Sequence, residues 1–433
     1  MPDMKKKTTA ILEYLRGFNP LCVAIALSLL MLAVIIYVRG TTNCNSDTPS
    51  YISAWNDCYR YGEIDIFRTP VYPILIGTGR MLFGADHWGL LPTIVQIIVF
   101  YACGIAFSRM ALGIISDRRV AWLTVFLYFL FYPIINTLSL MGTEALAFSL
   151  TALWMFCVWR FMQRARLSYG IAISLLTVAE IMLRPSLLIL ALAIVGLALA
   201  GVFVKQYRRQ GLLLLLTLIP VGAVYKIYVD EMERLTGFDT ISVVSVYNNY
   251  YMARQYNDIF PELLPDKPEA VELMRRYHKE GDCLSREYLL KLWSEITELE
   301  KTGILTYREM NDYAMAMKKN YPEIWYKYIF RRIGDSLVSM GPLKNACNYL
   351  VVLCYSILFV TAWIKCRKFS IINFLTLMIG GGSLLSLFLY AQNDFGRLML
   401  PTSAVLILMG GQLLNCLRFR PFGFRLVNFY EKR

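Results

Sequence analysis

Ten apolar runs constrain this chain more than any other feature of its sequence. A helix that crosses a bilayer needs roughly 17–25 predominantly apolar residues, because the hydrocarbon core is about 30 Å thick. Runs of that kind lie at about 20–39, 90–108, 120–138, 143–160, 169–183, 186–204, 211–229, 347–364, 370–390 and 396–417. We therefore predict an all-α polytopic membrane protein with about ten transmembrane helices.

The composition agrees with a chain whose solvent is mostly lipid. Of 433 residues, 57% are hydrophobic and only 17% are charged, whereas soluble domains are about 25% charged. The sequence has no P-loop, no dinucleotide fingerprint, no nucleophile elbow and no His/Cys cluster with metal-ligand spacing. ATP-driven transport and soluble cofactor chemistry are therefore unsupported. Cys44 and Cys58 share one segment between runs and could form a disulfide, which spacing alone cannot decide.

The positive charges orient the ten runs. Lys and Arg precede the first run and follow every second run after it, and by the positive-inside rule those segments are cytoplasmic. They are Lys5–Lys7, Arg109, Arg118, Arg119, Arg160, Arg164, Arg166, Lys205, Arg208, Arg209, Lys365, Arg367, Lys368, Arg418 and Arg420. We therefore expect a multi-pass protein of the inner (plasma) membrane, with both the N-terminus and the C-terminus in the cytoplasm.

The same pattern divides the chain into three parts. Residues 1–229 form a transmembrane module of seven spans with a first outer loop at 40–89, and residues 343–433 add three spans and a basic tail. Residues 230–342 carry a net charge of −4 against +17 for the remainder, so topology explains the basic total better than nucleic-acid binding does. Because Leu289, Leu292 and Ile296 recur at helical spacing, we predict a small, mostly helical outer (periplasmic) domain there.

Charged residues on the outer side are candidates for function. Asp47, Arg68, Glu144, Arg184 and Arg397 all fall at outer ends of predicted spans or in the first outer loop. The three arginines oppose the positive-inside bias, so they need compensation near the membrane. A bound anion such as a lipid phosphate would compensate them, because the guanidinium fork matches phosphate oxygens, and so would nearby carboxylates.

Ordinary structural roles remain open for the same residues. Asp47 could cap a short helix that starts at Thr48-Pro49, and Arg68 could be an interfacial arginine. Glu144 could supply negative charge at the start of the fourth span, and Arg397 could pair locally with Asp394.

In order along the chain, these residues resemble motifs of the GT-C superfamily of membrane glycosyltransferases. The resemblance is to the bacterial branch near the aminoarabinose transferases and protein O-mannosyltransferases. Asp47 with Tyr51 four residues on is similar to the family's Asp-Glu-x-x-Tyr stretch, with Thr48 in place of its second acidic residue. The later motifs that resemble the family are Arg68-Thr69-Pro70-Val71-Tyr72-Pro73, Thr143-Glu144, Leu183-Arg184-Pro185 and Gly396-Arg397-Leu398 with Pro401.

The resemblance implies an enzyme that moves a sugar from a polyprenyl-phosphate donor to a hydroxyl of an envelope lipid, glycan or protein on the outer face. It makes residues 1–229 the catalytic module and implies an inverting displacement assisted by a metal or by arginines. Mg²⁺ or Mn²⁺ is the implied cofactor. The resemblance implies that Asp47 and Glu144 are catalytic, with Asp47 as the general base, and that the same two residues bind the metal. It implies that Arg68, Arg184 and Arg397 bind the donor phosphate. Tyr51 and Tyr72 are the implied substrate-binding residues.

Three other functions remain open. A flippase for lipid-linked sugars would also use arginines to hold phosphate, although transporters commonly carry inverted repeats and no repeat is evident in the sequence. An O-antigen-type polymerase or ligase would share the lipid-linked donor but transfer whole glycans. A non-catalytic membrane subunit is the fourth. The pairing of Asp47 with Arg68 in the first loop favours the transferase of single sugars.

Overall fold

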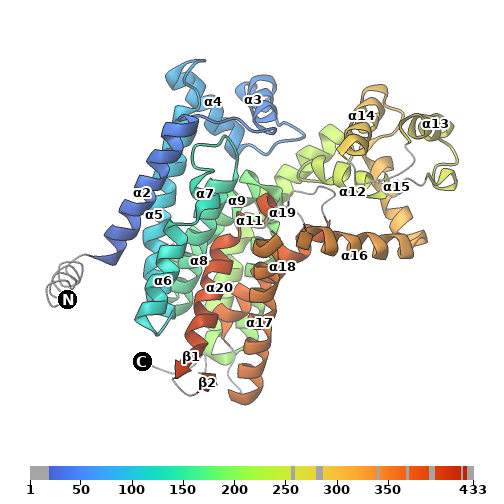
Figure 1. The fold of residues 1–433 in the computed structure, drawn as a ribbon. Helices are drawn as coiled ribbons and strands as arrows, with labels where there is room; N and C mark the ends of the chain where they lie inside the picture. The colour runs from blue at the N-terminus through green and yellow to red at the C-terminus, as the bar shows by residue number, and fades with distance from the viewer. Residues whose placement is uncertain are drawn as a thin grey trace, which may run out of the picture.

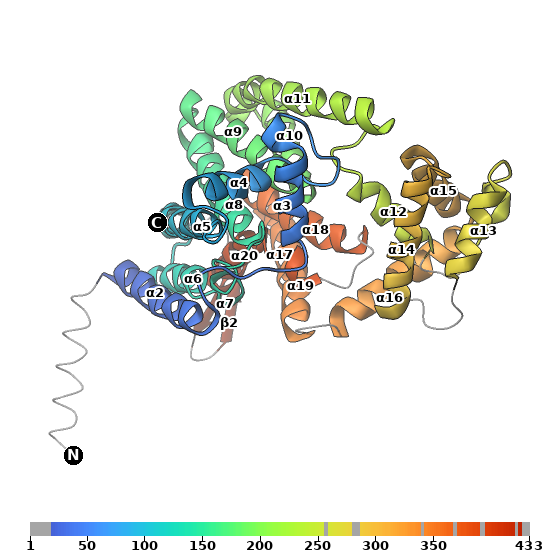
Figure 2. The same cartoon turned by 90° about the horizontal axis from the view of Figure 1, so that it is seen from above.

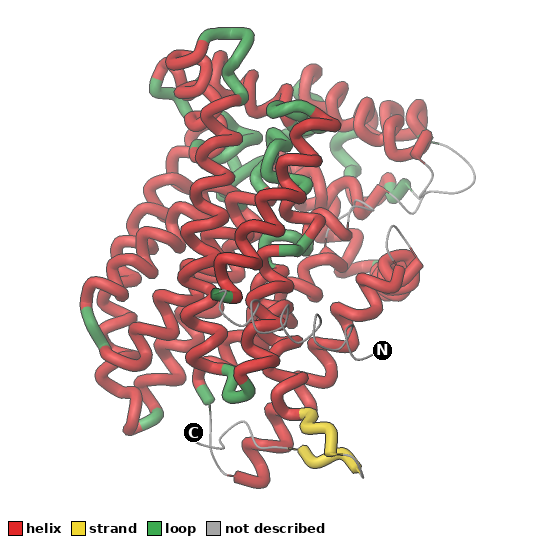
Figure 3. Tube along the Cα trace, turned by 60° about the vertical axis from the view of Figure 1, so that its left-hand side comes forward, coloured by secondary structure: helices red, strands yellow, loops and turns green. Residues whose placement is uncertain are grey.

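The chain folds almost entirely into helices. The computed structural model describes residues 19–254, 259–278, 286–338, 342–366, 370–389, 395–420 and 423–426. Within that part, the only strands are β1 (Leu417–Arg420) and β2 (Gly423–Leu426), which pair antiparallel at one end of the helical bundle (Figure 3). The predicted all-α fold class is confirmed.

Seven stretches of the described chain are long and apolar enough to cross a membrane. They are formed by α2 (Pro20–Arg39), α5 (Leu90–Ile114), α6 (Arg118–Phe129) with α7 (Tyr132–Ile135), α8 (Glu144–Arg164), η2 (Pro185–Leu187) with α10 (Leu188–Phe203), η3 (Lys205–Tyr207) with α11 (Arg208–Thr236), and α17 (Pro342–Cys366). Each coincides with a predicted apolar run.

The remaining three runs are not among these seven stretches, so the count of about ten spans is not confirmed. These runs form the helices α9 (Leu167–Leu183), α18 (Ile371–Leu389) and α20 (Ser403–Cys416). α9 stops before Arg184, because a residue that precedes a proline disfavours the helical conformation. The run that ends in α20 is divided, since Phe395–Leu398 forms a separate short helix, α19, before Pro401.

α8 lies at the centre of the bundle and α2 at its edge. In the most apolar window of α8, 72% of residues are buried inside the protein, against 22% for α2. The core around α8 contains Phe100, Tyr128 and Trp154, all with no exposed surface. The N-terminal end of α8 is therefore a rigid platform, and it carries Glu144.

The first loop covers the end of the bundle opposite the two strands. It contains α3 (Thr48–Asp57), η1 (Tyr59–Tyr61) and α4 (Val71–Phe83), and α3 and α4 lie at the top of Figure 1. α4 buries Tyr72 and Ile76 completely. This packing fixes the loop over the start of α8.

Residues after α11 form a second helical cluster with its own core. It comprises α12 (Val244–Arg254), η4 (Pro261–Leu263), α13 (Pro268–Tyr277), α14 (Arg286–Thr302), α15 (Tyr307–Asn320) and α16 (Pro322–Val338). α12 to α15 stand beside the bundle when it is seen from above (Figure 2). Tyr250, Leu292 and Met310 lie in this core. α11 runs on to Thr236, beyond residue 229, and the proposed three-part division stays a prediction.

Two further expectations meet the structure at the chain ends and in the first loop. The basic residues of the N-terminal segment, Lys5 to Lys7, lie outside the described residues, so the orientation of the termini stays a prediction. Cys44 and Cys58 are both free thiols. The Cys58 thiol donates to the Asp65 carboxylate at 3.8 Å, and burial raises the pKa of that thiol, with the Asp65 charge adding to the effect.

Candidate active site

The turn before α3 presents the Asp47 carboxylate to the top of the bundle. Asn45 holds this turn, because its Oδ1 accepts from the backbone N–H groups of Asp47 at 3.0 Å and Thr48 at 2.9 Å. The Thr48 hydroxyl then donates to the Met141 carbonyl at 3.0 Å and ties the turn to the segment before α8. Among the described residues, the Asp47 carboxylate bonds to guanidinium groups and makes no cap of α3. Asp47 therefore occupies the N-cap position of α3, but its side chain does not cap the helix.

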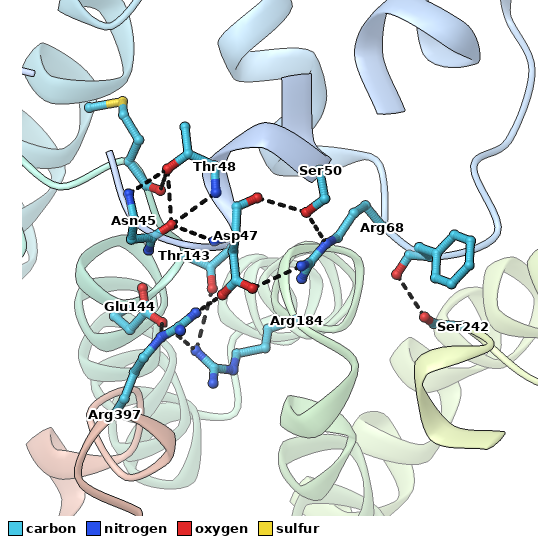
Figure 4. Close-up of polar contacts among 12 residues, drawn as sticks. Asn45, Asp47, Thr48, Ser50, Arg68, Thr143, Glu144, Arg184, Ser242 and Arg397 are labelled. Carbon is cyan, nitrogen blue, oxygen red and sulfur yellow. Dashed lines mark hydrogen bonds and ion pairs between the residues drawn. The ribbon is translucent and has the colours of Figure 1, made fainter. Parts of the chain in front are cut away.

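Arg68 reaches Asp47 from the other end of the same loop. Its Nη2 donates to Asp47 Oδ1 at 2.9 Å, and its Nε donates to Ser50 Oγ at 2.8 Å (Figure 4). The Ser50 hydroxyl in turn donates to the Asp47 carbonyl at 2.7 Å. Arg68 thus contacts one partner through each of two guanidinium nitrogens, which fixes the plane of the guanidinium as a lysine could not.

The Arg68 backbone is held independently of its side chain. Asp65 Oδ1 accepts from the N–H groups of Phe67 at 2.9 Å and Arg68 at 2.5 Å, and the Tyr59 hydroxyl donates to the Arg68 carbonyl at 2.5 Å. Burial raises the pKa of Asp65, while the N–H groups of Arg68 and Phe67 lower it. Ser242, just before α12, donates to the Phe67 carbonyl at 2.7 Å. The second helical cluster therefore helps to position Arg68.

Glu144 begins α8 and is the most buried charge of the site. Its side chain is 1% exposed, and its Oε1 accepts from Arg184 Nη1 at 3.2 Å and from Arg397 Nε at 2.5 Å. Within the described chain its Oε2 has no hydrogen-bond partner. A Cβ at residue 142 would lie 2.5 Å from that oxygen, so a larger residue at 142 would displace the Glu144 carboxylate. Glu144 does sit in the first turn of α8, but its carboxylate bonds to arginines.

Arg184 and Arg397 arrive from two sequence-distant breaks between helices. Arg184 is extended (φ −155°, ψ 112°) at the junction of α9 and η2, and it also contacts Thr143 Oγ1 at 3.4 Å. Arg397, on α19, bonds to Asp47 Oδ2 through Nη2 as well as to Glu144. The predicted alternative partner, Asp394, lies outside the described residues. Arg397 therefore links the two carboxylates directly.

The five charged residues form one network at the end of the bundle that the first loop covers (Figure 4). Three guanidiniums face two carboxylates, which leaves one formal positive charge in excess. The side chains of Asp47, Arg68 and Arg397 are 23%, 24% and 29% exposed, so a ligand can reach the network from the protein surface. A partly buried site with excess positive charge suits a further anion.

The two predicted tyrosines form the wall behind Arg68. The Arg68 guanidinium carbon lies 4.6 Å from the ring centroid of Tyr51, a cation–π contact. The Tyr72 ring meets the Tyr51 ring edge-on at 5.0 Å, and Tyr72 has no exposed surface. Burial raises the pKa of Tyr51, and the Arg68 charge lowers it less, so its hydroxyl stays protonated. Tyr51 borders the site, and Tyr72 supports Tyr51.

The residues of the site do not fit a divalent cation. The two carboxylates assigned to a metal by resemblance already bond to guanidiniums, and Arg397 lies between them. In the described part of the chain no group of three His, Cys, Asp or Glu side chains comes together for metal binding. Of the four oxygens of these two carboxylates, Glu144 Oε2 alone makes no hydrogen bond within the described residues. Mg²⁺ requires six oxygen ligands, some of which can be water.

Sequence reasoning assigned no supporting role to the residues that hold the charged groups in place. Asn45, Ser50, Asp65, Thr143 and Ser242 all bond within or directly behind the network. Asn45 and Asp65 carried a local signal, because Asx side chains two or three residues before a turn commonly accept from its backbone N–H groups. Ser242 carried none, since its partner is 175 residues away in sequence.

The arrangement defines a polytopic helical bundle with its charged site under the first loop. No family model matches the sequence, and no curated protein matches it. Among solved structures, the oligosaccharyltransferase of Archaeoglobus fulgidus in complex with Zn and sulfate aligns with 92% of this chain at a TM-score of 0.52 and 13% identity. The same enzyme tethered to an acceptor peptide with the NVT sequon aligns with 90% at a TM-score of 0.50 and 12% identity.

The similarity covers about nine tenths of this chain but only part of the archaeal enzyme. The aligned region is 49% of that enzyme in both structures, so this chain spans about half its length. At 13% identity the likeness establishes the fold, and the chemistry has to be argued from the residues themselves.

Proposed function

We propose that this chain is a GT-C glycosyltransferase that moves a sugar from a polyprenyl-phosphate donor to a hydroxyl acceptor on the outer face of the membrane. The observation that carries the proposal is the network in which Arg68, Arg184 and Arg397 hold Asp47 and Glu144. The GT-C-type fold supports the same reading. The donor's sugar and the acceptor, whether lipid, glycan or protein, stay open.

Asp47 is the general base of the proposed reaction. The acceptor oxygen attacks the anomeric carbon, the bond from that carbon to the phosphate oxygen breaks, and the acceptor proton passes to Asp47. A single displacement of this kind inverts the anomeric configuration. Each Asp47 oxygen already accepts one guanidinium bond, but a carboxylate offers roughly four lone-pair sites. Room for the acceptor proton therefore remains.

The arginines stabilise the leaving polyprenyl phosphate. Charge develops on the phosphate oxygen as the glycosidic bond breaks, and preorganised guanidiniums stabilise such charge. When donor is absent, Asp47 and Glu144 keep the three guanidiniums aligned and neutralise most of their charge. Glu144 thus acts as the fixed counter-charge of Arg184 and Arg397.

We propose arginine-assisted transfer without a required metal. The archaeal oligosaccharyltransferase was solved with Zn, whereas here Arg397 bridges the two carboxylates that the resemblance assigns to a cation. A guanidinium in that place supplies positive charge with fixed direction.

The proposal is tested by donor binding and by sugar transfer with purified protein. Arg68→Ala removes one charged donor to the phosphate, a loss of about 1.5–3 kcal/mol or roughly 10- to 150-fold in donor affinity. Arg68→Lys recovers only part of that loss. Arg80→Ala is the matched control, because Arg80 bonds to Asn56 on the far side of the same loop. Unchanged affinity in both Arg68 variants would remove the phosphate role.

A flippase is distinguished by a vesicle assay. Translocation of the lipid-linked sugar across sealed vesicles, with no transfer to any acceptor, would replace the transferase with a flippase. Transfer by wild type in detergent, where no sealed membrane exists, would support the transferase.

A further inference from the structure

α16 lies at the level where α17 begins, and it runs across the direction of α17 (Figure 1). Only three residues separate Val338, the last residue of α16, from Pro342, the first residue of α17. The two helix ends are therefore at most roughly 15 Å apart, because consecutive Cα atoms are about 3.8 Å apart. The stretch of α17 that is long and apolar enough to cross a membrane begins at Ala346. This places α16 at the membrane surface.

One face of α16 packs against the core of the second helical cluster. Ile324, Trp325 and Ile329 are half-buried and contact that core. The Nζ of Lys318, on α15, lies 4.5 Å from the centroid of the Trp325 ring, a cation–π contact that joins the two helices. The rest of the cluster lies on the side of α16 away from the direction in which α17 runs (Figure 1). The opposite face of α16 is therefore turned toward the membrane.

That opposite face carries an aromatic stripe beside a basic stripe. Tyr326 and Phe330 are 60% and 71% exposed, and they lie on one side of the helix because they are four residues apart. Lys327 and Arg331 are exposed and have the same spacing, about 100° further around the helix. Glu323, in the first turn, is exposed on this face as well. Aromatic side chains beside Lys and Arg are typical of helices that lie in the plane of a membrane interface.

We propose that this face of α16 binds the surface of the membrane at which α17 begins. The Tyr326 and Phe330 rings enter the boundary between headgroups and acyl chains, and Lys327 and Arg331 bind the headgroups of anionic phospholipids. Each Lys or Arg near an anionic lipid surface strengthens its attraction about fivefold. Glu323 costs little there, because the N-terminal end of a helix favours negative charge.

The binding would attach the second helical cluster to the membrane independently of α11 and α17. The cluster needs a fixed position, because Ser242 just before α12 donates to the Phe67 carbonyl at 2.7 Å beside the charged network. The proposal does not depend on sugar transfer, since it concerns a surface outside that network.

The test is photo-cross-linking of the full chain in nanodiscs of phosphatidylglycerol and phosphatidylcholine. The photoreactive residue p-benzoylphenylalanine replaces Phe330, and mass spectrometry identifies each cross-linked lipid by its headgroup. The ratio of phosphatidylglycerol to phosphatidylcholine among these lipids should exceed the ratio in the nanodisc about fivefold. In a chain that also carries Lys327→Gln and Arg331→Gln, the lipid cross-links should persist at the nanodisc ratio, because the ring still reaches lipid but the charges are gone.

Leu216 and Leu290 are matched control positions for the photoreactive residue. Leu216 is 61% exposed on α11, within a stretch long and apolar enough to cross a membrane, and should cross-link both lipids at the nanodisc ratio. Leu290 is 62% exposed on α14, which lies on the part of the second helical cluster away from α16, and should cross-link neither lipid (Figure 1).

Three results would overturn the proposal. They are the absence of lipid cross-links from residue 330, the plain nanodisc ratio when both basic residues are present, and a cross-link from residue 330 to a second copy of the chain. The third result would assign this face of α16 to a dimer interface. None of these measurements involves sugar transfer, so failure here leaves the proposed function standing, and failure of the proposed function leaves this result standing.

Discussion

Replacing Arg397 by methionine should destabilise the protein chiefly through Glu144. The Glu144 side chain is 1% exposed, and its Oε1 accepts from Arg397 at 2.5 Å and from Arg184 at 3.2 Å. Removing one partner of a buried ion pair costs about 3–5 kcal/mol. Because Arg184 remains as a second partner, we expect a smaller cost, about 2–3 kcal/mol. The bond from Arg397 to the more exposed Asp47 adds at most about 1 kcal/mol.

A double-mutant cycle with Glu144→Gln isolates this contribution. In the Gln background no buried carboxylate is left without its partner, so Arg397→Met should cost only about 1 kcal/mol. The coupling energy is then roughly 2 kcal/mol. It is measured by denaturant unfolding in mixed micelles with tryptophan fluorescence as the signal. Lys226→Met is the control, since its pair with Asp230 is on the surface (70% and 50% exposed) and should change nothing measurable.

The reasoning fails if the cycle closes with a coupling below about 0.5 kcal/mol, the error of additivity for independent sites. That result would mean that Arg397 and Glu144 do not share a buried interaction. The bridge between the two carboxylates would then have no energetic basis.

Three further predictions concern the metal, the second helical cluster and its pH dependence. Treatment with EDTA should leave sugar transfer within about twofold of the untreated rate, because guanidiniums hold both carboxylates; loss of activity that Mg²⁺ or Mn²⁺ restores would contradict this. Arg254→Met should destabilise the α12–α15 cluster by about 3–5 kcal/mol, because Arg254 and Glu295 are both 0% exposed and bond at 2.8 Å. Limited proteolysis should then cleave residues 244–320 faster than in wild type, and unchanged protection would refute the prediction. Thr306→Ala should cost about 1 kcal/mol, because Thr306 and Glu309 form a capping box at the start of α15. The Thr306 N–H, with help from Lys267, holds the pKa of Glu309 below its usual value. The Glu309 contribution is therefore present above the ordinary glutamate pKa and is lost as the pH falls through the lowered one, and Glu309→Gln should flatten that part of the stability–pH curve.

The helices and the charged residues of the site could be predicted from sequence because each leaves a local signal. Apolar runs of spanning length are visible without a partner, and all ten are largely helical, although two are divided, between α6 and α7 and between α19 and α20. Arg184 before Pro185 and Glu144 at the start of an apolar run are equally local features. The short extents of α9 and α20 could not be predicted, since they depend on Pro185, Pro401 and the packing around them.

The connections between the charged residues could not be predicted from spacing. Arg397 bonds to Asp47 across 350 residues, and nothing in either neighbourhood selects that partner over a local carboxylate. Likewise, the expectation that Asp47 caps α3 is reasonable from its place before Thr48-Pro49. The structure differs because Asn45 already binds the N–H groups at that turn, which leaves the Asp47 side chain available to the arginines.

The most direct test of the central claim is sugar transfer by Asp47→Asn. The substitution keeps the volume and the hydrogen-bonding reach of the side chain but removes the base, so kcat should fall by about 10²- to 10⁴-fold while polyprenyl-phosphate binding persists. Asp57→Asn, at the end of the same helix and bonded to Ser53 at 2.6 Å, is the control and should transfer at the wild-type rate. Transfer by Asp47→Asn within about twofold of wild type would contradict the assignment of Asp47 as the base and, with it, the proposed site.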